Sequence, residues 1–114
     1  MTNTKAQTAG RAIEDVAAER KRQINTEGWT PEHDDAHKGG TLVSAAVAYA
    51  AHASVGIQVA AHKPETYQSV QPPGYWPWDR AWWKPKSPRR DLVRAAALII
   101  AEIERLDRAE ARRD

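Results

Sequence analysis

The C-terminal part of the chain carries the pattern that most restricts its fold. Ser87-Pro88 joins an N-cap residue to a proline at the first helical position, and Asp91 places an acid in the first turn. Apolar residues then recur at helical spacing. We predict a core stripe made of Leu92, Ala96, Ile99, Ile103 and Leu106, with Val93, Ala97 and Ile100 alongside. A helix over residues 88–111, about 35 Å long, needs partner helices to bury such a face.

Two further segments supply those partners. Over residues 9–27 the spacing of Ile13, Val16, Ala17 and Ile24 predicts an amphipathic helix, which Gly28 ends. The chain therefore predicts an all-α fold, a small helical bundle with three main helices near 9–27, 41–55 and 88–111. At 114 residues it is one domain, 1–114, with flexible ends expected at about 1–7 and 112–114.

The middle helix, with Thr41 as its expected N-cap, is apolar on two sides. One stripe contains Leu42, Ala45, Ala46, Tyr49 and Ala53, and a second contains Val43, Val47 and Ala50. Such a helix is typically central or buried in a subunit interface. Because its many alanines leave little side-chain volume for a monomer core, we predict a homo-oligomer.

Residues 64–87, called the Trp flap below, contain five of the seven prolines and four of the five tryptophans. Disordered segments are poor in aromatic residues, so we predict an ordered loop that folds back over the helices. One helical turn is expected near Trp78 to Trp83. The tryptophans either line a ligand site or supply the core volume that the alanine helices lack.

Composition excludes several classes of protein. The chain has no cysteine, so it forms neither a disulfide nor a thiolate metal site. No apolar run reaches the ~20 residues of a membrane span, and the N-terminus lacks the apolar core of a secretory signal. We therefore expect a soluble, cytoplasmic protein with no membrane partner.

Arg20 interrupts the apolar stripe of the first helix. The interpretation that we favour is that its stem lies on the core while its charge stays in water. In the alternative, Arg20 points into a polar pocket and meets an anion or the aspartates of the following loop.

That loop, residues 27–40, contains a candidate metal site. The ligand types of His33, Asp34, Asp35 and His37 suit Mg²⁺, Mn²⁺ or Zn²⁺. The spacing matches no specific signature. A polar connecting loop, with solvated histidines and aspartates that accept backbone N–H groups, is favoured on sequence alone.

Residues 75–90, which lead from the Trp flap into the last helix, are rich in aromatic and basic side chains. Indole rings stack on nucleobases, and Arg and Lys bind phosphate, so this segment suits a nucleotide. The candidate ligand-binding residues are Arg20, Trp29, Trp76, Trp78, Arg80, Trp82, Trp83, Lys84, Arg89 and Arg90. In the alternative, the basic residues keep a Trp-rich surface soluble. Sequence-specific binding of duplex DNA is disfavoured because no helix carries a basic face.

Three motifs together carry a resemblance: GWTPEHDDAH, WPWDRAWWKP and PRRDLVRAAALIIAEIERLDR. They resemble a group of small accessory proteins of tailed bacteriophages and prophages, over about Val16 to Arg108. The resemblance implies a phage or prophage origin.

The helix order is more distantly similar to the MazG-like all-α nucleoside triphosphate pyrophosphohydrolases, in which ExxE and ExxD pairs hold Mg²⁺. Here the middle helix opens Thr41-Leu42-Val43-Ser44 without an acid, and the last opens Asp91-Leu92-Val93-Arg94. Glu104-x-x-Asp107 matches ExxD but lies near the far end of its helix.

Three functions are compatible with these features. The first is binding of a nucleotide-like phosphorylated small molecule, with sequestration of a host defence signal as its use in a phage. The second is metal-dependent hydrolysis of nucleotides, using the His/Asp loop and carboxylates such as Glu19. The third is inhibition of a host defence protein through the tryptophan surface.

Overall fold

The computed structural model describes residues 4–37, 40–59 and 63–113, and within them it contains helices and connecting segments but no strand. The helices are α1 (Thr4–Asn25), α2 (Pro31–Ala36), α3 (Thr41–Gln58), α4 (Pro64–Gln68), the 3₁₀ turn η1 (Arg80–Trp82) and α5 (Pro88–Arg112). The all-α prediction with three main helices is confirmed. The extreme ends, residues 1–3 and 114, lie outside the described residues.

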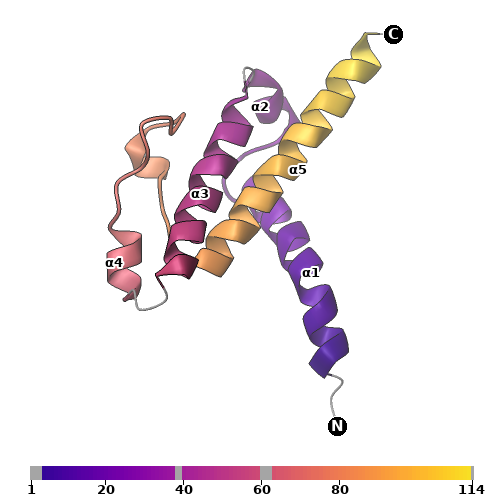
Figure 1. The fold of residues 1–114 in the computed structure, drawn as a ribbon. Helices are drawn as coiled ribbons and strands as arrows, with labels where there is room; N and C mark the ends of the chain where they lie inside the picture. Colours follow the sequence, from indigo (N-terminus) through magenta and orange to yellow (C-terminus); the bar gives the residue numbers. More distant parts are fainter. Residues whose placement is uncertain (1–3, 38–39, 60–62, 114) are drawn as a thin grey trace.

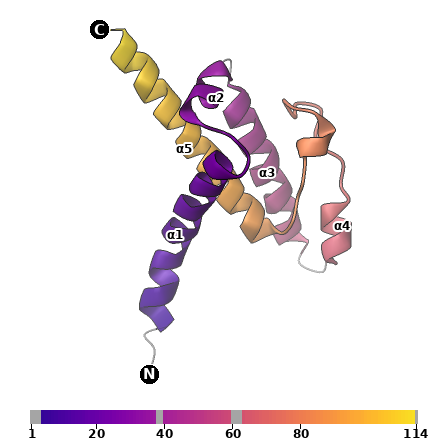
Figure 2. The same ribbon diagram turned by 180° about the vertical axis from the view of Figure 1, so that it is seen from behind.

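Helices α3 and α5 lie side by side and run in opposite directions, and α1 crosses behind α5 and projects away from it (Figure 1). The reverse view shows α1, α2 and their connection on the other side of the pair (Figure 2). The Trp flap runs along the side of α3 that faces away from α5. None of the described helices is long and apolar enough to cross a bilayer.

The core joins the small residues of two helices to the aromatic rings of the flap. Leu42, Ala45, Ala46, Ala48 and Tyr49 of α3 pack with Ala95, Leu98 and Ala101 of α5 and with Trp83. Trp83 stacks on Tyr49, with ring centroids 4.9 Å apart, and Trp76 meets both rings edge-on. The interpretation of the tryptophans as core volume is therefore correct for Trp83 and for the half-buried Trp76.

Two predicted core stripes are wrong. On α5 the side chains of Leu92, Ile99, Ile103 and Leu106 are 42–52% exposed, whereas Ala95, Leu98 and Ala101 are buried. Val93 and Ala97, which were expected alongside the stripe, are buried as predicted. The helix has two apolar faces, and the face with smaller residues lets α3 approach closely, so that face forms the contact. Periodicity alone favoured the face with the larger side chains.

On α1 the predicted stripe is also displaced, because Ile13 is 77% exposed while the polar Glu19, Arg20 and Gln23 are buried. Where α1 meets α5, charged residues of α5 face it: Arg90 pairs with Glu19 and Glu104 pairs with Arg20. Polar residues of α1 therefore turn inward to pair with them.

Two details at the helix ends also differ from expectation. The loop predicted over residues 27–40 contains α2, which begins with Pro31 and is capped by Thr30. The N-cap of α3 is Gly40, in a left-handed conformation with φ 80°, rather than Thr41. At α5 the expected cap is confirmed, since Ser87 Oγ accepts the Arg90 N–H at 3.2 Å.

Candidate functional site

The end of α1 fixes the position of Trp29. Gly28 has a φ of 76°, a conformation that other residues rarely adopt, and the Trp29 N–H donates back to the Gln23 carbonyl at 2.8 Å. Thr30 then accepts the His33 N–H at 3.2 Å and starts α2. The chain thus turns within a few residues and places Trp29 and His33 with their rings parallel, centroids 6.1 Å apart.

The Trp flap closes a pocket over these rings. Its volume is about 260 Å³, and its lining consists of Trp29, His33, His37, Trp78, Asp79 and Trp82. Trp29 lies between Trp78 and Trp82, with centroid distances of 5.4 and 6.3 Å. The indole N–H of Trp78 is buried without a hydrogen-bond partner among the described residues. This aromatic pocket therefore offers flat apolar walls to a ligand.

The two histidines form one edge of the aromatic pocket. Their Nε2 atoms are 3.0 Å apart, and His33 Nδ1 is 3.3 Å from Asp34 Oδ1. When His33 donates from Nδ1 to Asp34, its Nε2 is free to accept the Nε2 proton of His37. Burial, and secondly the charge of His33, lower the pKa of His37. The contact thus suits a neutral His37 ring that shares its Nε2 proton with His33.

A narrow polar crevice adjoins the aromatic pocket and shares Trp29 and Trp82 with it. Its volume is about 30 Å³, enough for a water-sized group. The polar side chains in its lining are Glu19, Arg22, Gln23, Glu27, Tyr49, Lys84 and Arg94. Gln23 is only 1% exposed, and its Oε1 atom has no partner among the described residues. At the mouth, Lys84 Nζ lies 5.7 Å from the centre of the Trp82 ring.

Glu19 anchors an ion-pair network at the inner end of this crevice. It accepts hydrogen bonds from Arg22 at 2.8 Å and from Arg90 of α5. Burial raises the pKa of Glu19, but the hydrogen bonds and charges of the two arginines outweigh burial, and the net pKa is lowered. Next to it, Arg89 pairs with Asp15 at 2.9 Å on the surface.

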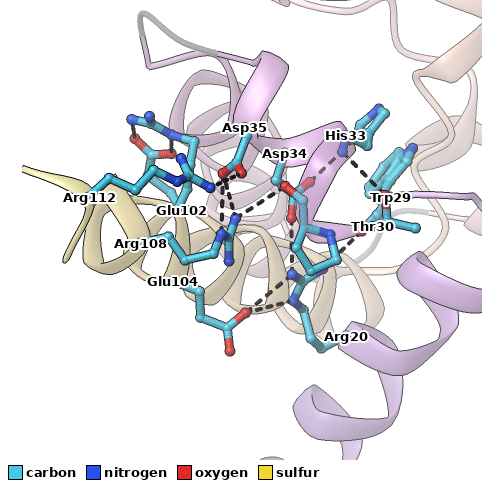
Figure 3. Close-up of polar contacts among 12 residues, drawn as sticks. Arg20, Trp29, Thr30, His33, Asp34, Asp35, Glu102, Glu104, Arg108 and Arg112 are labelled. Atoms are coloured by element: carbon cyan, nitrogen blue, oxygen red, sulfur yellow. Dashed lines mark hydrogen bonds and ion pairs between the residues drawn. The ribbon is translucent and has the colours of Figure 1, made fainter. Parts of the chain in front are cut away.

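Arg20 lies outside the aromatic pocket, in a separate network (Figure 3). Its guanidinium donates to Asp34 at 3.0 Å, to Glu104 at 3.2 Å and to the Trp29 carbonyl at 3.4 Å. The favoured interpretation, a charge kept in water, is wrong, because Arg20 is 7% exposed. The alternative is correct: Arg20 meets an aspartate of the following segment, and the pair links α1, α2 and α5.

Both aspartates expected beside the histidines are bound by arginines, and only Asp34 also contacts His33. Asp35 accepts from Arg108 at 2.9 Å and from Arg112 at 2.6 Å, and these hydrogen bonds lower its pKa. Within the described ranges, no group of three or more His, Asp or Glu side chains is placed to hold a metal ion. The structure thus pairs His33 with His37 but does not assemble the four-residue set predicted for a metal.

The predicted ligand residues divide into separate groups. Trp29, Trp78 and Trp82 line the aromatic pocket together with both histidines, and Lys84 lies at the crevice mouth. Other members do not line it: Trp76 and Trp83 belong to the core, Arg80 is an exposed residue of η1, and Arg89 and Arg90 pair with α1. Arg20, another of these candidates, does not line the aromatic pocket and lies in the separate network with Asp34 and Glu104.

Sequence reasoning missed Gln23, Arg22 and Arg94, which line the crevice. A signal existed for Gln23, because Glu19, Gln23 and Glu27 recur every four residues and form a polar stripe beside the apolar one.

Comparison of the chain with protein-family models, with curated proteins and with solved structures gave no match.

Proposed function

We propose that this protein binds a nucleotide-like phosphorylated small molecule, whose ring enters the aromatic pocket. The observation that carries the proposal is the enclosure of about 260 Å³ between three tryptophans and two histidines. Whole-ligand sites usually measure ~300–1,000 Å³, so a pocket of this size suits the flat ring of a ligand rather than all of it. Indole faces bind any nucleobase by stacking.

The neighbouring crevice supports the phosphorylated part of the proposal. Its cations are Arg22, Lys84 and Arg94, against the carboxylates Glu19 and Glu27. Because its interior admits only water-sized groups, phosphoryl oxygens would lie at the mouth, beside Lys84. The water-sized interior is lined by Gln23, whose buried Oε1 has no partner among the described residues, so a water molecule would bind there beneath the ligand.

The metal-dependent hydrolase is the weaker candidate, because its carboxylates are already paired. Glu19 is held by two arginines and Glu104 by Arg20. A carboxylate bound in this way gives up those ion pairs before it binds a metal ion. If the chain has the phage origin that its motifs resemble, binding without hydrolysis would serve to sequester a host signalling nucleotide.

A panel of nucleosides, mononucleotides, triphosphates and cyclic dinucleotides tests the proposal. A ligand that binds should quench tryptophan fluorescence and raise the melting temperature by mass action. Trp82→Ala should weaken binding by ~1–3 kcal/mol, the cost of losing one stacking surface. Trp82 is 44% exposed, so its removal leaves the core intact.

Two further variants sharpen the test. Lys84→Ala should weaken the binding of phosphorylated ligands and leave the affinity for the matching nucleosides unchanged. Tyr75→Ala is the matched control, because Tyr75 is a 51% exposed aromatic residue of the same flap that does not line the aromatic pocket. If no ligand of the panel shifts fluorescence or melting, the proposal fails and the protein-inhibitor hypothesis is favoured. Release of pyrophosphate or phosphate in the presence of Mg²⁺ would instead identify a hydrolase.

A further inference from the structure

Large aliphatic side chains of α3 and α5 remain exposed outside the core. We call this the open face and define it by Val43 and Val47 of α3 and by Leu92, Ile99, Ile103 and Leu106 of α5. Their exposed fractions range from 39% to 52%. It contains part of the second apolar stripe expected on the middle helix and much of the stripe that the last helix was expected to bury.

The contacts of α5 on its other sides show why this face is free. Arg90 and Glu104 reach across to α1, and Ala95 and Leu98 pack in the core with α3. The stripe from Leu92 to Leu106 occupies the remaining side of the helix. Figure 1 shows α3 and α5 next to each other, with α1 behind them.

The open face is large for the surface of a monomer. With the usual surface area of valine, leucine and isoleucine, the exposed fractions amount to roughly 500 Å² per copy, which is at the upper end for the largest apolar patch of a monomer, ~300–600 Å². A stable interface buries ~800 Å² per partner, and the polar rim around such a patch supplies the difference.

We propose that a second copy of this chain covers the open face, so that α3 and α5 of two copies form a four-helix arrangement around a two-fold axis. Leu92, Ala96, Ile99, Ile103 and Leu106 alternate in steps of four and three residues, the spacing of a helix that packs lengthwise against another. No charged residue interrupts this stripe. A partner must therefore offer an equally long, uncharged apolar strip, and the open face of a second copy does so.

A two-fold axis also suits the geometry of the pair. When one copy is rotated by 180° onto the other, each copy presents its α3 and α5 to the α3 and α5 of its partner. The same patch therefore forms both sides of the interface. Residues near the middle of the stripe, Ile99 and Ile103, then lie close to their counterparts in the other copy.

The mass in solution is the first test. Light scattering coupled to size exclusion should give twice the 12.7 kDa of one chain at micromolar concentrations. Replacing both Ile99 and Ile103 by glutamate should raise the dissociation constant at least roughly a hundred-fold, because assembly would then bury carboxylates. Both side chains are about half exposed, so the folded monomer tolerates the change, and circular dichroism verifies this.

Ile13→Glu is the matched control, since Ile13 is a 77% exposed isoleucine on the projecting part of α1. It should leave the mass unchanged. The proposal is overturned by a wild-type protein that stays monomeric, or by an assembly that the double variant leaves intact. A larger assembly that the double variant dissolves would still support pairing across this face.

Cysteine cross-linking gives a second readout that does not depend on destabilising the assembly. The chain has no cysteine of its own. Ile99→Cys or Ile103→Cys should yield a disulfide-linked dimer under mild oxidation, whereas Ile13→Cys should not. Cross-linking through position 13 alone would place the contact on α1 and overturn the proposal.

Discussion

Replacing Arg20 by alanine should destabilise the protein far more than the loss of a surface ion pair. The Arg20 side chain is 9% exposed and that of Asp34 is 1% exposed, and they are bonded at 3.0 Å. The same guanidinium also binds Glu104 and the Trp29 carbonyl (Figure 3). One side chain thus satisfies three acceptors that come from three different parts of the chain.

The magnitude follows from what each substitution leaves behind. In Arg20→Ala the Asp34 carboxylate stays buried with only the His33 contact at 3.3 Å, and removing one partner of a buried pair costs ~3–5 kcal/mol. In Asp34→Asn the Arg20 guanidinium keeps its bonds to Glu104 and the Trp29 carbonyl. The free energy of unfolding should therefore fall by only ~1–3 kcal/mol, the cost of the weakened bond to residue 34. Arg20→Ala should therefore be clearly the more damaging change.

Urea unfolding measures both values, at one fixed protein concentration so that association contributes equally. Arg89→Ala is the control, because the pair of Arg89 with Asp15 is 49% and 39% exposed and should contribute at most ~1 kcal/mol. The double variant Arg20→Met/Asp34→Leu removes both charges together. It should be more stable than Arg20→Ala, since no unpaired charge remains.

The reasoning would be refuted if Arg20→Ala cost no more than Arg89→Ala. It would also be refuted if the double variant were no more stable than Arg20→Ala, because the cost would then come from lost packing and not from the stranded carboxylate.

Two further predictions concern stability. Because the pKa of His37 is lowered in the folded protein, by burial first and by His33 second, the unfolded chain binds more protons below pH 6.5. The melting temperature should therefore fall as the pH drops through this range, and His37→Gln should flatten the slope; an unchanged slope would contradict the pKa shift. A Cβ at Gly56 would lie 2.6 Å from the buried ring of Tyr67, so Gly56→Ala should cost ~1–3 kcal/mol in urea unfolding. Gly74→Ala, where a Cβ meets nothing within 4 Å, should cost less than ~0.5 kcal/mol, and equal costs would contradict the clash.

The start of α5 and the end of α1 were predictable because their signals are local. Ser87 with Pro88 fixes the start of α5 within one residue, and Gly28 supplies the left-handed turn after α1. Capping depends on the backbone of three or four neighbouring residues, all visible in the sequence. The short helix α2 was missed although Thr30-Pro31 carries the same type of start signal, because six residues are too few to show a period.

The faces that pack were not predictable from periodicity. A helix with two apolar faces leaves the choice to its partners, and here the partner of α5 is the alanine-rich surface of α3. Two helices that meet through small residues approach closely and make more contacts. Helices that meet through large side chains are held further apart. That comparison needs both surfaces, which one sequence pattern does not contain.

The candidate site was predictable in composition and not in arrangement. Trp29, His33, His37, Trp78 and Trp82 were each singled out by residue type, and the structure gathers them around one pocket. Which of the four flap tryptophans enter the core depends on Tyr49, whose hydroxyl donates to the Trp82 carbonyl and accepts the Lys84 N–H. These long-range hydrogen bonds set the orientation of the flap and leave no local trace in the sequence.

The inward charges of α1 and the outward aliphatic residues of α5 have a common consequence for stability. Glu19, Arg20 and Gln23 occupy positions where an ordinary helix would place apolar side chains, so the contact between α1 and α5 depends on ion pairs. Ion pairs of this kind stabilise a fold weakly once the loss of hydration is counted.

Fully burying an aliphatic side chain is worth ~1.5–3 kcal/mol, and the half-exposed residues of the open face retain about half of that for association. Dimer formation would thus supply the apolar burial that a single copy lacks. Ile99→Glu/Ile103→Glu should accordingly bring the melting temperature down to that of the isolated monomer and remove its dependence on protein concentration. A melting temperature that is independent of concentration in the wild type would contradict this link.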